Sequence, residues 1–172
     1  MAPKNAHTTA RLVIADDHAV LRLGLEIALA RHPRLRRVAS VADSGELVDF
    51  LQGHPCDVLV TDFRMPGGRY GDGLEMLAYL RGHYPRLRIV VLTMVDDPDV
   101  LRGISGSGAS ALLSKEDDIK QVCDALFKGS PNEPYVSPRL RRLMADGPRR
   151  GAKADGARRR DSEAVCAPRS PA

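Results

Sequence analysis

The stretch VLVTDFRMPGG, residues 58–68, decides how this chain folds and where its chemistry lies. Its first four residues are apolar or β-branched and are typical of a buried strand. An acid, Asp62, follows where the strand should end, and the Met-Pro-Gly-Gly after it is typical of a sharp turn. A strand that leads an ionisable side chain into a turn indicates that this side chain is delivered to a site.

Short strand-like runs of the same kind recur along the chain. Five are rich in β-branched residues or Leu: LVIA (12–15), RVASV (37–41), DVLV (57–60), RIVVL (88–92) and SALL (110–113). Helix-like segments alternate with them, so this order predicts five βα units in about 120 residues. Nearly continuous apolar strands are typical of a parallel sheet covered on both faces. We therefore predict an α/β fold with a doubly wound, five-stranded parallel sheet.

The segments between these strands carry helix signals. Apolar spacing predicts helices at residues 19–32, 73–83 and 116–129. Asp43 can cap a further helix with Glu46 as its capping-box partner, and Asp97-Pro98 supplies a cap and a first-turn proline to another. That last helix is expected to be weak, because three glycines interrupt residues 102–108.

Bulk composition indicates one domain of ordinary size with an appendage. The 172 residues are 43% hydrophobic but only 4% aromatic, so Val, Leu, Ile and Ala must fill the core. Cys56, Cys123 and Cys166 have neither metal-like nor disulfide-like spacing, which fits a reducing cytosol. Residues 1–10 lack the apolar segment of a signal peptide, and no run approaches the ~20 apolar residues that span a bilayer. We expect a cytoplasmic protein that does not enter a membrane.

Polar residues follow several of the predicted strands at the point where each ends. They are Asp16 and Asp17, Asp62, Thr93, and Ser114-Lys115. Each alone is more often a helix cap, a turn residue, a packing residue or a solvated charge. Because parallel strands end at one edge of a sheet, where such sheets bind ligands, we expect the whole set to meet in one pocket.

Three carboxylates in one pocket need a cation. Two of them about 4 Å apart repel by ~4 kcal/mol at an effective dielectric near 20. Oxygen ligands with few fixed protein contacts suit Mg²⁺, which keeps several waters. Aspartate is also a covalent nucleophile for phosphoryl groups, and Lys115 and Thr93 can supply charge and a hydrogen bond to phosphoryl oxygens.

These motifs resemble the receiver domain of two-component response regulators. The resemblance rests on ADD (15–17), TDFRMPG (61–67), LTM (92–94) and SK (114–115), and it covers residues 11–130. The receiver fold is flavodoxin-like. The long loop MPGGRYGDG (65–73) is similar to that of Rcs-type capsule-synthesis regulators within the NarL-type branch.

The resemblance implies a role for each matching residue. Asp62 would accept phosphate from the phosphohistidine of a histidine kinase or phosphotransfer protein. Asp17, Asp62 and the backbone carbonyl of Arg64 would bind Mg²⁺ directly, and Asp16 would bind it largely through water. Lys115 would pair with the phosphoryl group, and the Thr93 hydroxyl would move to bond it.

The sequence departs from the common receiver pattern at three positions. Met94 stands where many receivers have a small residue, and we expect its bulk to obstruct the attacking water and lengthen the life of the aspartyl phosphate. Leu112 occupies a position that is often aromatic, which argues against an aromatic rotamer switch. Lys115-Glu116 replaces the usual Lys-Pro. All three departures agree with the Rcs-like branch.

The two ends of the chain differ from the domain between them. Residues 11–130 hold 15 basic and 17 acidic residues, whereas residues 131–172 hold 10 and 5, so the excess charge behind the net +4 lies in the C-terminal segment. We expect a disordered N-terminus over 1–10 and a linker with a short helix over 131–144. Residues 145–172 contain no Leu, Ile, Phe or Tyr, which predicts a disordered basic tail.

The output of the domain follows from the same resemblance. NarL-type regulators continue with a four-helix DNA-binding domain, which the composition of 145–172 does not allow. We therefore expect DNA contact only through a lost or partner output domain, in a homodimer or a heterodimer with another regulator. The tail, which includes Arg158-Arg159-Arg160, is either solvated or binds nucleic acid non-specifically, or it is the truncated or out-of-frame end of a regulator that once had its output domain. The glycine-rich residues 102–108 are either a bistable signalling element or an ordinary frayed helix.

The sequence thus predicts a signalling switch rather than an enzyme with a separate substrate. It would catalyse its own phosphotransfer and slow autodephosphorylation, and it would control a transcriptional output. One alternative is a module for protein interaction or heterodimerisation that works without phosphorylation. Another is an Mg²⁺-dependent phosphohydrolase with Asp62 as its nucleophile, although Arg64 stands where such enzymes usually carry a second acid.

Overall fold

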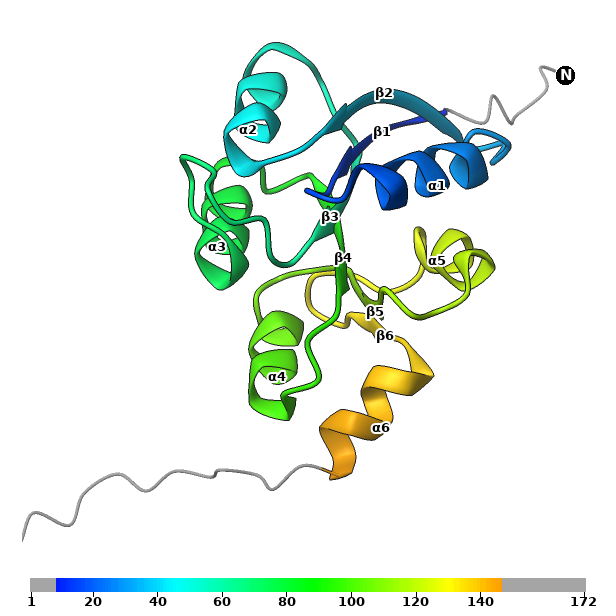
Figure 1. The fold of residues 1–172 in the computed structure, drawn as a ribbon, viewed down its shortest axis with the longest axis vertical. Coiled ribbons are helices and arrows are strands. Elements are labelled where there is room, and N and C mark those ends of the chain that lie inside the picture. Colours follow the sequence, from blue (N-terminus) through cyan, green and yellow to red (C-terminus); the bar gives the residue numbers. More distant parts are fainter. Residues whose placement is uncertain (1–8, 147–172) are drawn as a thin grey trace, which may run out of the picture.

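The computed structural model describes residues 9–146 and consists of one parallel sheet with helices on both faces (Figure 1). Its strands are β1 (Ala10–Ala15), β2 (Leu35–Val41), β3 (Val58–Asp62), β4 (Arg88–Thr93), β5 (Ala111–Ser114) and β6 (Tyr135–Val136). Its helices are α1 (Ala19–Leu29), α2 (Ser44–Gly53), α3 (Gly73–His83), α4 (Pro98–Gly106), α5 (Ile119–Ala125) and α6 (Pro138–Asp146). The sheet order is β2-β1-β3-β4-β5-β6, and every neighbouring pair is parallel.

The sheet separates two apolar cores, because alternate residues of a strand point to opposite faces. Val13 of β1 packs with core residues of α2, α3 and α4, whereas Leu12 and Ile14 pack with those of α1 and α5. Figure 1 shows the same division, with α2, α3 and α4 on one side of the sheet and α1 and α5 on the other. The predicted doubly wound α/β fold is confirmed.

The prediction of five strands is wrong by one, because β6 extends the sheet beyond β5. Tyr135 and Val136 pair with Ala111 and Leu112. This strand has two residues, too few to show the alternation on which strand prediction rests. The chain can turn into β6 because residue 129 is a glycine. Its φ is +69°, and a Cβ there would lie 2.3 Å from the backbone nitrogen of Tyr135.

The helices differ from the predicted ranges mainly in length. α1 ends at Leu29 rather than 32, and α5 spans Ile119–Ala125 rather than 116–129. The start of α5 moves because Asp118 accepts a hydrogen bond from the Lys120 amide and Asp117 accepts one from the Ser114 amide, so both acids are occupied outside the helix. The glycines do not prevent α4, since Asp97 caps it through the Asp99 and Val100 amides.

The segment after α5 returns to the domain instead of leaving it. α6 lies against α4, with Leu140 only 1% exposed and the Arg102 guanidinium donating to the Met144 carbonyl at 2.8 Å. A helix therefore does form within the predicted linker, and it reaches Asp146. The predictions for residues 1–8 and 147–172, which include Cys166 and Arg158-Arg159-Arg160, lie outside the described residues. Within residues 9–146, no helix is long and apolar enough to cross a bilayer.

Candidate functional site

Four neighbouring strands end at one edge of the sheet and bring polar side chains there. The register pairs Ala15 with Thr61, Asp62 with Leu92, and Thr93 with Ser114, so these strands stop at nearly the same level. A cleft of about 450 Å³ opens at this edge. Its lining residues are Asp17, His18, Asp62, Arg64, Pro66, Asp72, Thr93, Met94, Val95 and Lys115.

The centre of the cleft is an ion pair between β3 and the residue that follows β5. Lys115 Nζ donates a hydrogen bond of 2.5 Å to Asp62 Oδ2 and lies 2.8 Å from Asp16 Oδ2. The Asp16 contact is not aligned as a hydrogen bond, so Asp16 Oδ2 is a buried acceptor without such a partner. Asp16 is 1% exposed and Asp62 5%. One ammonium is therefore shared by two carboxylates that water hardly reaches.

This sharing perturbs both members of the pair. Burial raises the pKa of Asp62 above its ordinary value, and the hydrogen bond from Lys115 offsets that only in part, while Asp16 adds repulsion. Burial alone would lower the pKa of Lys115, but its close contacts with the Asp16 and Asp62 carboxylates outweigh burial and the pKa rises. Lys115 is thus held as the ammonium, and the charge on Asp62 remains incompletely compensated.

Asp17 and His18 extend the acidic pair to the rim of the cleft. His18 Nδ1 lies 2.6 Å from Asp17 Oδ1 and 3.1 Å from Asp16 Oδ1, and the His18 amide donates to Asp16 Oδ1 at 2.8 Å. One ligand atom from each of Asp16, Asp17, His18 and Asp62 can be chosen so that all four lie within 4.8 Å of one another. With bonds of about 2.0–2.4 Å, atoms so spaced can surround one divalent cation. Asp16 Oδ2, which faces Lys115 without an aligned hydrogen bond, and the incompletely compensated charge on Asp62 also fit such an ion.

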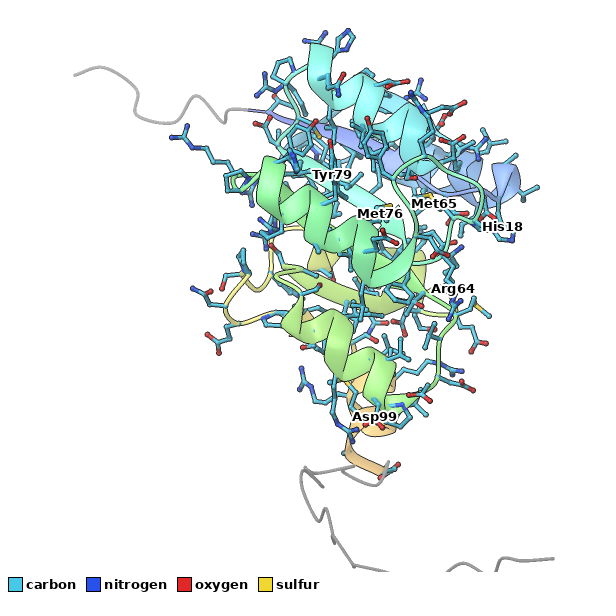
Figure 2. All side chains as sticks on the ribbon, turned by 90° about the vertical axis from the view of Figure 1, so that its left-hand side faces the viewer. His18, Arg64, Met65, Met76, Tyr79 and Asp99 are labelled. Atoms are coloured by element: carbon cyan, nitrogen blue, oxygen red, sulfur yellow. The ribbon has the colours of Figure 1, made fainter. Side chains whose placement is uncertain are left out.

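The loop after β3 is anchored so that Arg64 stays at the rim. Met65 turns inward and is buried beside Met76 in the core, whereas Arg64 is exposed (Figure 2). A Cβ on Gly68 would lie 2.0 Å from Ser44 Oγ, so glycine is required where the loop crosses the start of α2. The sharp turn that the sequence predicts after Arg64 is present, and the carbonyl of Arg64 as a metal ligand stays a prediction.

Comparison with known proteins agrees with this geometry. A family model for the response regulator receiver domain matches residues 12–127. This chain belongs to the response regulator receiver family. It is 33% identical over 140 residues to the transcriptional regulatory protein RcsB of Salmonella typhi, covering 79% of this chain and 65% of that protein. It is 34% identical over 130 residues to the oxygen regulatory protein NreC of Staphylococcus haemolyticus, covering 76% of this chain and 59% of that protein.

Solved structures place the receiver close to the same relatives. The isolated receiver domain of RcsB from Salmonella enterica serovar Typhimurium, determined with the phosphomimetic BeF₃⁻, superposes with a TM-score of 0.73 at 28% identity, covering 79% of this chain and 99% of that one. RcsB dimers bound to two parallel DNAs give 0.74 at 28% identity, covering 80% and 68%. The receiver spans under two thirds of the length of the curated relatives it matches, and the predicted Rcs-like resemblance is confirmed.

The structure brings together nearly all of the predicted site residues of the receiver. Thr93 is 1% exposed at the end of β4, and its Oγ1 accepts a hydrogen bond of 3.0 Å from the Val95 amide, which leaves its proton free to donate. Met94 lines the cleft with 62% of its surface exposed. Leu112 is different, since it is fully buried in the core and does not line the cleft.

The sequence did not predict two polar residues that line the cleft, His18 and Asp72. His18 directly follows the acidic pair in the loop between β1 and α1, and that adjacency was the available signal. Asp72 precedes α3 as its cap residue but makes no side-chain capping hydrogen bond, and its carboxylate lines the cleft instead. Nothing in the sequence around Asp72 indicated that the loop after β3 would return it to the cleft that contains Asp62.

Proposed function

We propose that this receiver is a phosphoacceptor in a two-component pathway, in which Asp62 takes a phosphoryl group from a phosphohistidine. The single observation that carries the proposal is the state of Asp62. It is 5% exposed at the end of a central strand, its pKa is raised by burial, and one shared ammonium faces it in a cleft open to solvent. A buried carboxylate whose charge is incompletely compensated is typical of a functional site rather than of a structural ion pair.

The acidic set fits a divalent cation, which we propose to be Mg²⁺. Asp17, Asp62 and the Arg64 carbonyl would hold it directly, and Asp16 would hold it largely through water. The ion would supply positive charge to the phosphoryl oxygens and shield the attacking carboxylate from them. These carboxylates lie within reach of one another before any ion arrives, so binding requires little rearrangement of the backbone.

The chain's own residues account for the transfer step. A carboxylate oxygen of Asp62 attacks the phosphorus, an O–P bond forms, the P–N bond of the phosphohistidine breaks, and the electron pair stays on the donor imidazole. Lys115, already within hydrogen-bond distance of Asp62, follows the negative charge onto the phosphoryl oxygens. The Thr93 hydroxyl donates to one of them, which changes its hydrogen bond to the Val95 amide. The chain thus catalyses its own phosphorylation and, more slowly, the hydrolysis of the product.

An apolar groove beside the cleft offers a place for the donor protein. Val20, Leu23 and Ile27 of α1 are 86%, 56% and 64% exposed, an unusual set for one helix. Of these, Val20 and Ile27 line a groove of about 760 Å³ between α1 and α5, which shares His18, Met94 and Lys115 with the cleft. We propose that a histidine kinase or phosphotransfer protein packs an apolar helix here and presents its phosphohistidine to Asp62.

The output that we propose is transcriptional. The relatives include a protein named as a transcriptional regulator, and RcsB has been determined as dimers bound to DNA. This receiver would form a homodimer or a heterodimer with another regulator, and contact with DNA would come through an output domain of such a regulator. The loop from Thr93 leads directly into α4, and α6 rests on α4, so a movement at Thr93 can reach the C-terminal end of the domain.

Mass spectrometry after incubation with acetyl phosphate and Mg²⁺ tests the proposal. We expect a mass increase of one phosphoryl group in the wild type, and none in Asp62→Ala or when Mg²⁺ is removed by chelation. The absence of any increase in a folded wild-type protein would contradict phosphorylation and leave a phosphorylation-independent interaction module. Multiple turnover of acetyl phosphate without a retained phosphoryl group would instead indicate a phosphohydrolase.

A further inference from the structure

We propose that His18 becomes a nitrogen ligand when this site holds a transition-metal ion such as Mn²⁺, so that the receiver binds such an ion more tightly than three carboxylates alone would. This inference rests on the metal site of the proposed function, and it concerns a side chain that the phosphotransfer step does not use.

The first observation is what the His18 side chain does not do. His18 is the cap residue that precedes α1, a position where a side chain normally accepts hydrogen bonds from the first free amides of the helix. Its ring makes no such bond. Nδ1 instead faces Asp17 Oδ1 at 2.6 Å and Asp16 Oδ1 at 3.1 Å. The ring is therefore directed at the acidic set rather than at its own helix.

The second observation is the spacing of these atoms. In an octahedral site with bonds of about 2.1 Å, adjacent ligand atoms are about 3 Å apart and opposite ones about 4.2 Å. The distance from Nδ1 to Asp16 Oδ1, 3.1 Å, lies near the adjacent value, and that to Asp17 Oδ1, 2.6 Å, is shorter. One ligand atom of each of the four residues lies within 4.8 Å of the others, the span of an ion with bonds of about 2.4 Å. The ring thus already stands where a fourth protein ligand would stand.

The third observation is a buried carboxylate oxygen of the same cluster that lacks an aligned hydrogen bond. Asp16 Oδ2 is buried and lacks an aligned hydrogen bond, although Lys115 lies 2.8 Å away. The His18 ring is 67% exposed at the mouth of the same cleft. An ion that enters from solvent would therefore reach the exposed imidazole before the buried carboxylates. Both the imidazole and the carboxylates can bind a cation.

The chemistry of the set decides which cation gains from His18. Mg²⁺ prefers oxygen and keeps several waters, so a water can replace the imidazole at little cost. Imidazole suits the later first-row ions, and Mn²⁺, although it also favours oxygen, stands at the start of that series and accepts an imidazole more readily than Mg²⁺ does. The expected signature is a site that serves Mg²⁺ with oxygen atoms only and engages His18 when a transition-metal ion is bound.

Pulsed electron paramagnetic resonance on the full chain loaded with Mn²⁺ alone tests this inference. We expect modulation from a directly bonded ¹⁴N nucleus in the wild type and its loss in His18→Gln. The Mn²⁺ affinity should fall by at least about tenfold in this variant, because loss of a residue that only supports a metal ligand already weakens metal binding by about 10–100-fold. The Mg²⁺ affinity should stay within about twofold, because water replaces the ring. The matched control is His83→Gln at the far end of α3, which should change neither.

The outcomes separate this inference from the proposed function. Mn²⁺ binding without ¹⁴N modulation, or modulation that persists in His18→Gln, would overturn the role of His18 and leave the phosphoacceptor proposal intact. An equal loss of Mn²⁺ and Mg²⁺ affinity would also overturn it, because His18 would then act only by positioning the acids. Failure of the wild type to bind either ion would contradict the metal site on which both proposals rest.

Discussion

Asp57, which directly precedes β3, and Asp62, which ends it, each face a basic side chain. Asp57 receives three hydrogen bonds of 2.8 Å from Arg11: the backbone amide and Nε donate to Oδ2, and Nη2 donates to Oδ1. Asp62 receives one from Lys115, which it shares with Asp16, and one of 3.2 Å from the Arg64 amide. The residue type is the same, so the difference lies in how completely each charge is satisfied.

The two surroundings move the carboxyl groups in opposite directions. The hydrogen bond from Arg11 lowers the pKa of Asp57, and about two fifths of that side chain is exposed. Burial raises the pKa of Asp62. A bidentate guanidinium leaves no acceptor position open for chemistry, whereas an ammonium shared between two acids leaves room for a metal and a phosphoryl group. The amino edge of the sheet is therefore built for stability and the carboxyl edge for reaction.

The largest difference between the two acids should appear in the phosphorylation rate when the basic partner of each acid is removed in turn. In Lys115→Ala, we expect the initial rate of phosphorylation by acetyl phosphate to fall by about 10²–10³-fold, the usual loss when one donor to a developing anion is removed. In Arg11→Ala, the rate should remain that of the wild type, because Arg11 lies at the other edge. Time-resolved intact-mass measurement gives both rates, and equal rates for the two variants would refute the division between the edges.

A smaller effect is expected from the exposed side chain at the mouth of the cleft. Met94 lines the cleft near Asp62, and in Met94→Ala water should reach the aspartyl phosphate more easily. We expect the dephosphorylation rate to rise by less than about tenfold, since a barrier change of under 1.4 kcal/mol is involved. The decay of the phosphorylated mass after removal of acetyl phosphate provides the measurement. An unchanged or slower decay would show that Met94 does not obstruct the water.

The smallest effects should appear in the pH dependence of stability, where the two acids differ in sign. Because the folded pKa of Asp57 lies below 3.8, its stabilisation is complete above that pH and is lost as the pH falls through the folded pKa. Asp57→Asn should therefore lower the free energy of unfolding at pH 7, within the modest range of exposed ion pairs, and should change it less in acid.

Asp62 should behave in the opposite way in the metal-free protein. Its folded pKa is raised above 3.8, so ionisation costs stability as the pH rises through the window between those values, and the full cost remains above it. Asp62→Asn should raise the free energy of unfolding at pH 7 and lose this gain below pH 3.8. Urea unfolding of both variants between pH 3 and pH 8 provides the test. Changes of the same sign at neutral pH would remove the distinction between the two ends of β3.

The sequence predicted the carboxyl edge far better than the amino edge, for a physical reason. Asp62, Thr93 and Lys115 each follow an apolar run, and parallel strands must end together, so one-dimensional order was enough to gather them. The pair of Arg11 and Asp57 depends on β1 lying beside β3, and neither residue stands out locally. That pairing follows from sheet order, which apolar patterning does not specify.

The elements that escaped prediction are short or held by contacts from distant residues. β6 has two residues and depends on the backbone of Gly129 fitting against Tyr135. α5 is shortened because Asp117 and Asp118 cap backbone amides, a choice that composition does not reveal. His18 lines the cleft because its Nδ1 contacts the carboxylates of Asp16 and Asp17. The spacing of apolar residues predicts which face of a segment is buried, but it does not predict which polar group a side chain contacts.

Reduction of the phosphorylated protein with borohydride tests the central claim most directly, because borohydride converts an aspartyl phosphate to homoserine. After incubation with acetyl phosphate and Mg²⁺, we predict homoserine at position 62 and unmodified aspartate at 57, read by fragmentation of the peptide that contains both. Asp57→Asn should leave the label at 62, and Asp62→Asn should abolish it. Homoserine at 57, or a label that survives in Asp62→Asn, would contradict the conclusion that the incompletely satisfied acid of β3 is the phosphoacceptor.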